Sequence, residues 1–254
     1  MVIAMKYIKK VLGSLRKADN DYKLIENGDR ICVGISGGKD STTLLYCLKL
    51  YQMFSKKEYE LIPIYCNMGF SNNDIKPLEQ YISSIGLKLI VYPTSISDIL
   101  DLNLDKNGKQ SCSLCSRLRK GAIINAAKQY NCNKLAFGHH NDDAVETLFM
   151  NMIHGGRIAT FKPSTYLERS KVTLIRPLIY AYESDIINVS KYLNFPIIKS
   201  GCKNDGNSER AQMKQLLNQL YHQYKCKDNF SLMLRNYTKV ELFKPSSEDT
   251  KKAE

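Results

Sequence analysis

The stretch VGISGGKDS, residues 33–41, places a glycine pair between two contrasting patterns of apolar residues. The preceding run RICVGIS is apolar and β-branched, which is typical of a buried strand. The following run STTLLYCLKLYQMF has Leu44, Leu45, Leu48 and Tyr51 at helical spacing. The motif is therefore predicted to lie on a strand-to-helix turn. There, the backbone N–H groups of the helix start and the positive end of its dipole can bind a phosphate.

The spacing of this motif excludes a Walker-type phosphate loop. That loop has four residues between its glycines, and a Ser or Thr follows its Lys. Here three residues separate Gly34 from Gly38, and Asp40 follows Lys39. A carboxylate at this point can act on phosphates through Mg²⁺, which commonly bridges carboxylate and phosphate oxygens. The six residues SGGKDS resemble instead the PP-loop of the ATP pyrophosphatases, in which the loop binds the β- and γ-phosphates of ATP. The other interpretation is a glycine-rich turn that binds no ligand.

Apolar runs of strand type alternate with helical patterns along the chain. The predicted strands are RICVGIS, ELIPIYCNMGF, LKLIVYP, NKLAFGHH and VTLIRPLIY. The predicted helices cover residues 40–54, 74–85, 113–130, 141–153 and 183–194. This order predicts an α/β fold with a doubly wound parallel sheet that helices cover on both faces. Because ligands bind beyond the carboxyl ends of such strands, we expect three stretches to meet at one edge, namely residues 36–41, 67–70 and 138–143.

We expect the 254 residues to form four segments. The first is an N-terminal helix over residues 1–27, and the second is a PP-loop ATP-binding α/β domain over residues 28–200. An inserted helix that begins with a C-x₂-C pair belongs to this domain. Residues 201–244 are predicted to form a C-terminal helical appendage, because SERAQMKQLLNQLYHQYK has helical spacing. Residues 245–254 are polar and are expected to be a disordered tail.

The composition is that of a soluble globular protein with an excess of positive charge. Hydrophobic residues make up 43% and charged residues 24% of the chain. No apolar run approaches the ~20 residues of a membrane span. The formal net charge of +12 favours a polyanionic partner such as nucleic acid, although a lysine-rich composition alone gives the same excess. Eight cysteines without a secretory signal indicate a reducing compartment, the cytoplasm.

A second motif, GHHNDDAVET at residues 138–147, follows the fourth predicted strand and opens a helix. Asp142 and Asp143 fall in its first turn, where the helix dipole favours negative charge, and this is also the purely structural interpretation. His139 and His140 are adjacent, so they do not share the helix face that a zinc pair requires. The motif resembles the second signature of the PP-loop enzymes, in which a His and an Asp lie beside the nucleotide.

Two further stretches match one branch of these enzymes. They are RPLIYAYESDI at residues 176–186 and DYKLIENGDRICVGISGGKDS at residues 21–41. Together with the second motif, they make the chain similar to the tRNA 2-thiocytidine synthetases and their sister thiolases. The resemblance covers residues 20–220, and its motifs occur in the same order as in the family.

A third motif, QSCSLCSRLRKGAIINAAKQY, places Cys112 and Cys115 at the start of a helix. A C-x₂-C pair can be a redox pair, half of a zinc site or part of an iron–sulfur site. A redox pair would follow an early strand of a thioredoxin-like unit, which this pair does not. Zinc usually has four ligands, often with a second close pair. The chain offers one further candidate thiolate, Cys202 in KSGCKNDGNSER.

The family resemblance implies that these three cysteines bind a [4Fe–4S] cluster with one open iron, and that this iron binds the sulfide a thiolase needs. Basic residues nearby either stabilise thiolates or tRNA phosphates or form a solvated helix face, namely Arg117, Arg119 and Lys120. The best-known synthetases have a second close cysteine pair after FPII, whereas this chain has only Cys202 there. Related thiolases also have one cysteine at this point, so three ligands remain and the identity of the modified base stays open.

The resemblance thus implies an ATP-dependent tRNA sulfurtransferase. It would adenylate the C2 oxygen of a cytidine, with cytidine 32 of the anticodon loop as the family's usual target, and replace that oxygen with sulfur. The implied ATP site consists of Ser36, Gly37, Gly38, Lys39, Asp40, Ser41, Asn67, Met68, Gly69, Gly138 and His139. Asp40 is the implied Mg²⁺ ligand. The implied catalytic residues are Asp40, Asp143, Cys112, Cys115 and Cys202.

Other functions remain compatible with the same residues. A PP-loop enzyme could thiolate another base, as 2-thiouridine thiolases do. It could also use an amine, as lysidine synthetases do, and would then have no use for the cysteine pair. A non-catalytic RNA-binding protein could bind zinc and a nucleotide. The implied partners are tRNA and a sulfur donor such as a cysteine desulfurase, and the sequence is compatible with a monomer or a homodimer.

Overall fold

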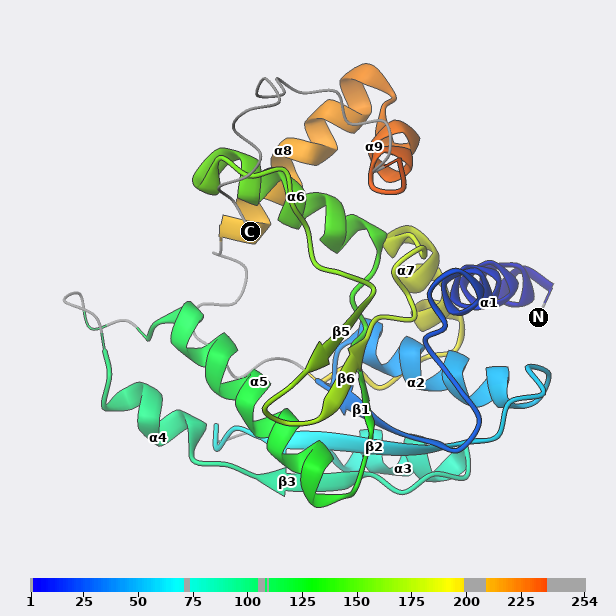
Figure 1. Cartoon of the computed structure of the whole chain (residues 1–254), viewed down its shortest axis with the longest axis vertical. Helices are drawn as coiled ribbons and strands as arrows, with labels where there is room; N and C mark the ends of the chain where they lie inside the picture. Colours follow the sequence, from blue (N-terminus) through cyan, green and yellow to red (C-terminus); the bar gives the residue numbers. More distant parts are fainter. Residues whose placement is uncertain (1, 71–73, 105–107, 109, 199–208, 237–254) are drawn as a thin grey trace, which may run out of the picture.

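The computed structural model describes residues 2–70, 74–104, 108, 110–198 and 209–236. Its centre is a six-stranded sheet in the order β3-β2-β1-β4-β6-β5 (Figure 1). The strands are β1 (Asp29–Ile35), β2 (Tyr59–Asn67), β3 (Ile90–Pro93), β4 (Lys134–Ala136), β5 (Ser164–Leu167) and β6 (Val172–Ile175). The helices are α1 (Val2–Tyr22), α2 (Lys39–Gln52), α3 (Lys76–Ser84), α4 (Ile96–Asp101), α5 (Cys112–Gln129), α6 (Asn141–Gly155), α7 (Glu183–Tyr192), α8 (Glu209–Tyr224) and α9 (Lys227–Met233).

The sheet is parallel except at one edge. β1 pairs in parallel with β2 on one side and with β4 on the other, and β6 continues the parallel sheet. β5 pairs antiparallel with β6. The chain builds β2 and β3 on one side of β1 before it returns to place β4 on the other side, so the strand order reverses between β1 and β4. Such a reversal is the point at which open α/β sheets bind ligands, beyond the carboxyl ends of the strands.

Helices cover both faces of the sheet, which confirms the predicted doubly wound α/β fold. α1, α2, α3 and α7 pack on one face and α5 packs on the other (Figure 1). Successive side chains of a strand point to opposite faces, and β1 follows this rule. Ile31 and Val33 are buried with Leu44 of α2, whereas Cys32 is buried with Ile123 of α5. β1 is therefore buried on both sides, as its continuous apolar run predicts.

The C-terminal helices α8 and α9 pack against α6 (Figure 1). Met213 and Leu217 of α8 are buried together with Val145 of α6. The rings of Phe149 in α6 and Phe230 in α9 lie 5.0 Å apart. This small apolar cluster docks α8 and α9 on α6, and Leu234 after α9 also packs against the main cluster of the sheet.

The structure adds three elements that the sequence pattern does not predict. α4, β5 and α9 have 6, 4 and 7 residues, which is too short for a clear period in the apolar residues. The strand predicted over residues 172–180 ends at Ile175. Pro177 follows and has no N–H for a ladder. The chain instead turns, with the N–H of Ile179 donating to the carbonyl oxygen of Arg176 (3.2 Å).

Two of the predictions concern residues that lie outside the described part of the chain: the third cysteine, Cys202, and the tail over residues 245–254. Within the described ranges, no helix is both long enough and apolar enough to cross a membrane.

Candidate active site

The loop after β1 is held together by the hydroxyl groups of its two serines. Ser41 Oγ accepts a hydrogen bond from the N–H of Ser36 (3.1 Å) and donates one to the carbonyl oxygen of Gly38 (3.1 Å). Ser36 Oγ accepts from the N–H of Gly38 (3.3 Å). α2 begins directly after Gly38, and no described side chain caps its first turn. The N–H groups of that turn are therefore available to an anion.

Two glycines let backbone segments approach this loop closely. Gly37 has a φ of +82°, and a Cβ on it would lie 2.9 Å from Cβ of Ile198. The N–H of Ile198 donates to the carbonyl oxygen of Gly37 (2.9 Å). A Cβ on Gly138, just after β4, would lie 2.9 Å from the backbone carbonyl carbon and oxygen of Asp40. The turn after β4 thus touches the loop after β1. Because the approach is so close, only glycine fits at these two positions.

Asp40 has a carboxylate oxygen that is poorly satisfied by the protein. Lys39 Nζ donates to Oδ2 of Asp40 (3.2 Å) and lies 3.1 Å from Oδ1. That Oδ1 atom is buried, yet it accepts no hydrogen bond from any described residue. Nε2 of His140 lies 3.8 Å from the same atom. A buried carboxylate oxygen that has an ammonium group nearby but accepts no hydrogen bond can bind a further cation, so its chemistry fits a Mg²⁺ ligand.

The start of α6 brings His140 and Asp143 to the same place. The N–H of His140 donates to Oδ2 of Asp143 (2.9 Å), and the N–H of Asp143 donates to Nδ1 of His140 (3.4 Å), so the two residues form a capping box. Nε2 of His140 lies 3.4 Å from Oδ2 of Asp143. This end of α6 therefore turns one carboxylate, Asp143, toward Asp40.

Asp142 points elsewhere, although it is adjacent in sequence. Its Oδ2 accepts a hydrogen bond from the N–H of Glu183 (2.8 Å), at the start of α7. Its Oδ1 lies 2.6 Å from Nζ of Lys227 in α9. The side chain is only 10% exposed. Asp142 therefore joins α6, α7 and α9 and is a structural residue.

His139 is a largely buried imidazole next to the site. Its ring lies 5.6 Å from the ring of Phe137 and 5.1 Å from that of Phe161. Its Nδ1 has no hydrogen-bond partner among the described residues, and neither has Nε of Arg176, whose guanidinium lies 4.7 Å from the Phe161 ring. Burial lowers the pKa of His139 to about 4, so the ring is neutral at pH 7. Two unused polar atoms thus lie around Phe161.

Glu183 belongs to the RPLIYAYESDI motif but has no predicted role, and it lies directly beside the loop. Its Oε1 is 3.1 Å from Nζ of Lys39 and accepts a hydrogen bond from Nζ of Lys214 (2.6 Å). Burial raises the pKa of Glu183, but the two lysines outweigh it and lower the pKa to about 2. For Lys39, burial lowers the pKa, but Asp40 and Glu183 outweigh it and the pKa is raised. The motif is the one signal that points to Glu183.

Arg210 of α8 lies along the other side of α6. Its Nη1 is 3.2 Å from Oδ1 of Asp143 and 3.6 Å from Oε2 of Glu146. Its Nη2 donates to Oγ1 of Thr147 (3.2 Å). Burial is the largest cause that raises the pKa of Glu146 to about 7. No local pattern in the sequence marks Arg210, because its neighbours on α6 are more than sixty residues away along the chain.

The cysteine pair begins α5. Cys112 is exposed and Cys115 is half-buried, and the hydroxyl group of Ser111 caps the helix by accepting from the N–H of Leu114 (3.3 Å). α5 leads directly into β4, which is parallel to β1, so the start of α5 lies toward the carboxyl edge of the sheet. Arg117, Arg119 and Lys120 are exposed on this helix. Among the described residues, which exclude Cys202, no group of three or more His, Cys, Asp or Glu side chains could hold a metal ion.

The turn after β2 packs against α4. The N–H of Ser97 donates to the carbonyl oxygen of Met68 (2.8 Å), and the N–H of Gly69 donates to Oδ1 of Asn67 (3.0 Å). Gly69 has a φ of +84°, and a Cβ on it would collide with Oγ of Ser97. Because β2 is parallel to β1, this turn lies at the same edge as the loop after β1.

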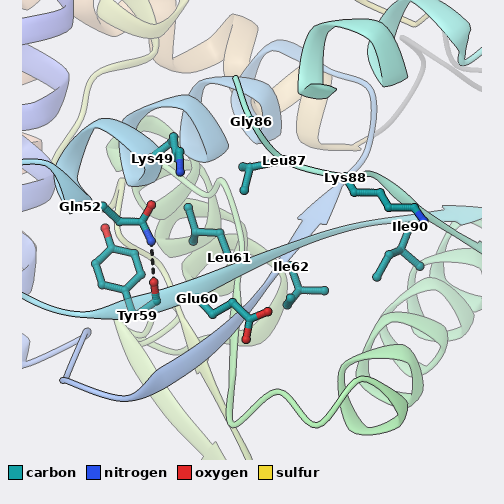
Figure 2. A pocket seen from close by; sticks show the side chains of 10 residues that line it. All are labelled: Lys49, Gln52, Tyr59, Glu60, Leu61, Ile62, Gly86, Leu87, Lys88 and Ile90. Atoms are coloured by element: carbon teal, nitrogen blue, oxygen red, sulfur yellow. Dashed lines mark hydrogen bonds between the residues drawn. The ribbon is translucent and has the colours of Figure 1, made fainter. Parts of the chain in front are cut away.

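A hollow of about 410 Å³ lies at the opposite edge of the sheet (Figure 2). The end of α2, the beginning of β2 and the segment before β3 line it, with Lys49 and Lys88 at its sides. Nε2 of Gln52 donates to the carbonyl oxygen of Tyr59 at one end of it. It therefore lies at the amino ends of the strands, away from the loop after β1 and from the cysteine pair.

The loop, the glycine contacts and the carboxylates at the reversal of strand order define a nucleotide-binding α/β protein. Residues 8–220 match the family described as the PP-loop domain, and the chain belongs to that family.

Within it, the chain groups with proteins named tRNA-cytidine(32) 2-sulfurtransferase. The one from Syntrophotalea carbinolica is 38% identical over 215 residues, which are 84% of this chain and 82% of the relative. The one from Geotalea daltonii is 37% identical over 84% of each chain. A solved structure, the U34-tRNA thiolase NcsA from Methanococcus maripaludis with its [4Fe–4S] cluster, superposes with a TM-score of 0.72 at 22% identity, covering 94% of this chain and 81% of that chain. This last likeness shows the fold.

Proposed function

We propose that this chain is an ATP-dependent tRNA sulfurtransferase that activates the C2 oxygen of a cytidine and replaces it with sulfur. By its relatives' name, the target is cytidine 32, in the anticodon loop. The proposal rests on one observation: the PP-loop and the start of α6 meet at the reversal of strand order. The PP-loop contributes Asp40, whose buried Oδ1 accepts no hydrogen bond from a described residue, and α6 contributes Asp143. The same sheet edge receives the start of α5 with Cys112 and Cys115.

The ATP phosphates are expected to bind in the loop over residues 36–41. The uncapped N–H groups at the start of α2 would donate to the β- and γ-phosphates, and Lys39 would pair with them. Asp40 would hold Mg²⁺ through Oδ1, with Asp143 as a second carboxylate. The turn over residues 67–69 would line the adenine pocket, with Gly138 and His139 on the other side. Fixed donors and a cation at the phosphates stabilise the charge that develops as pyrophosphate leaves.

The activated base requires a sulfur nucleophile. We assign the cysteine site to Cys112, Cys115 and Cys202. The first two lie in the first turn of α5. Described residues before and after Cys202 in the sequence contact the other two motifs. Ile198 bonds the PP-loop, and Arg210 bonds Asp143. Three thiolates fit a [4Fe–4S] cluster, which when bound supplies an open iron for sulfide.

The partners follow from the same chemistry. The net charge of +12 supports a polyanionic substrate, and a base in an anticodon loop can be splayed out to reach the adenylation site. The sulfur atom would come from a donor such as a cysteine desulfurase. Eight cysteines support a reducing compartment, so we assign the protein to the cytoplasm.

The experiment measures thionucleosides by mass spectrometry in tRNA from cells that lack 2-thiocytidine. The cells express the wild-type chain, Cys112→Ala, Asp40→Ala or, as a matched cysteine control, Cys226→Ala. Cys226 precedes α9 and bonds the carbonyl oxygen of Leu220 (3.6 Å), outside the site. We expect 2-thiocytidine to return with the wild type and Cys226→Ala and to be absent with the other two.

Three results would contradict parts of this proposal. If 2-thiouridine appears instead, the chemistry holds and the base is wrong. If the wild-type chain modifies tRNA without forming a thionucleoside, and Cys112→Ala makes the same modification to the same extent, a lysidine-type reaction with an amine is favoured. If purified protein contains stoichiometric zinc, is colourless and releases no pyrophosphate from ATP, the chain is a binding protein and not an enzyme.

A further inference from the structure

The C-terminal helix α8 brings a second lysine to the PP-loop. Lys214 Nζ donates to Oε1 of Glu183 (2.6 Å), and the same Oε1 atom lies 3.1 Å from Nζ of Lys39. One carboxylate therefore holds two ammonium groups, one from the loop itself and one from α8. Arg210, one turn earlier in α8, contacts Asp143 at the start of α6. α8 thus contacts Asp143 of the motif at the start of α6 directly and is linked to Lys39 of the PP-loop through Glu183.

This arrangement differs from an ordinary surface ion pair. Exposed pairs are worth little, but the Glu183 side chain is only 12% exposed and the Lys39 side chain 29%. Asp40 also pairs with Lys39, so two lysines and two carboxylates meet in a partly buried place, where Coulomb energies are larger than in water. An anion with several charges that binds to the loop would lie near both ammonium groups, and a Mg²⁺ ion on Asp40 would offset the charge of that carboxylate.

The position of Lys214 depends on packing that is independent of this charge cluster. Met213 and Leu217, which flank Lys214 on α8, are buried against Val145 of α6. A side chain on a docked helix loses less conformational freedom when it binds a ligand than one on a loose segment. Lys214 is 44% exposed, so its ammonium group remains accessible to a ligand.

We propose that Lys214 is a phosphate-binding residue of the nucleotide site, and that α8 therefore forms part of the ATP site with the PP-loop. The inference rests on the proposed function, because it takes ATP as the ligand of the loop. A tRNA backbone phosphate offers the same chemistry. We favour the β- and γ-phosphates of ATP because Glu183 joins Lys214 directly to Lys39, the lysine of the loop.

The test measures the dissociation constant of an ATP analogue with a methylene bridge between the α- and β-phosphates, by titration calorimetry with Mg²⁺ and without tRNA. Lys214→Met removes the charge and keeps the length of the side chain, and Lys214→Arg restores the charge. Lys227→Met is the matched control, because Lys227 also ties the appendage to the domain but pairs with the structural Asp142.

We expect Lys214→Met to weaken analogue binding about tenfold, which corresponds to about 1.4 kcal/mol, because a charge-assisted hydrogen bond to a partly exposed group is lost. Lys214→Arg should bind within about threefold of the wild type. Binding of AMP, which lacks the β- and γ-phosphates, should be the same in Lys214→Met and wild type. Lys227→Met should bind the analogue like the wild type and melt at a lower temperature.

The inference is overturned if Lys214→Met binds the analogue like the wild type, or if Lys214→Met and Lys227→Met weaken binding equally, since docking alone then explains the effect. It is also overturned if Lys214→Met raises only the KM for tRNA, which would make Lys214 an RNA contact. If the wild-type chain itself does not bind the analogue, the proposed function fails together with the inference.

Discussion

The substitution Asp142→Ala tests whether Asp142 and Asp143, two adjacent carboxylates with the same place in the sequence motif, have different roles. Asp142 accepts the N–H of Glu183 at the start of α7 and pairs with Lys227 of α9. We expect its removal to lower the free energy of unfolding and to leave binding of Mg²⁺–ATP within about threefold of the wild type. Asp143, by contrast, lies beside His140, whose Nε2 is also near Asp40, and it is proposed to act at the nucleotide site, so Asp143→Asn should reduce ATP-dependent pyrophosphate release at least about a hundredfold.

The size of the stability loss follows from the two contacts of Asp142. Loss of the acceptor at the start of a helix costs about 1 kcal/mol. The pair with Lys227, whose side chain is 36% exposed, adds about 1 kcal/mol after allowance for solvent screening. A total of about 2 kcal/mol lowers the melting temperature of a chain of this size by about 4–8 °C. Asp142→Asn keeps an acceptor oxygen for the N–H of Glu183, so it should lower the free energy of unfolding by only about half as much.

Urea unfolding followed by circular dichroism measures the stability, and titration calorimetry measures ATP binding in the same samples. Asp143→Asn serves as the matched variant, because its amide oxygen can still accept the N–H of His140 and preserve the capping box. If Asp142→Ala abolishes ATP binding without any change in unfolding, Asp142 is a ligand and the structural assignment is wrong.

Three further predictions address the loop, the buried histidine and the cysteine pair. A Cβ on Gly138 would overlap the backbone of Asp40, so Gly138→Ala should raise the KM for ATP about tenfold or more. Gly121→Ala is the control, because nothing lies within 4 Å of a Cβ at that position, and its KM should not change. Equal KM values for the two variants would refute the close contact. Because the pKa of His139 is lowered to about 4, the unfolded chain binds a proton that the folded chain does not, and stability should fall by about 2 kcal/mol between pH 7 and pH 5. Urea unfolding of His139→Phe should lack this part of the pH dependence; an unchanged slope would mean that the imidazole is not buried neutral. Cys112→Ser should abolish thionucleoside formation in the mass-spectrometric assay and leave ATP-analogue affinity unchanged, and a parallel loss of affinity would argue for a structural cysteine.

Local sequence patterns determine much of this protein. The strand-to-helix turn is predictable because glycine alone tolerates the backbone angle and the close approach that the turn has at Gly37. The alternation of strands with helices predicts the parallel sheet, and the sheet in turn predicts which edge receives the motifs. The short elements α4, β5 and α9 escape prediction because they contain too few residues to show a period.

The division of labour at the site depends on tertiary structure. Asp142 and Asp143 lie in the same helical turn, but about 100° apart around the axis. One side chain therefore contacts α7 and α9, and the other lies beside His140, whose Nε2 is also near Asp40. Lys214 reaches Glu183 because apolar residues dock α8 on α6. Such contacts join residues far apart in the chain, and their partners are chosen by packing. The sequence by itself therefore determines the loop that can bind phosphate and the sheet edge where it lies, whereas only the folded chain decides which carboxylates and cations surround it.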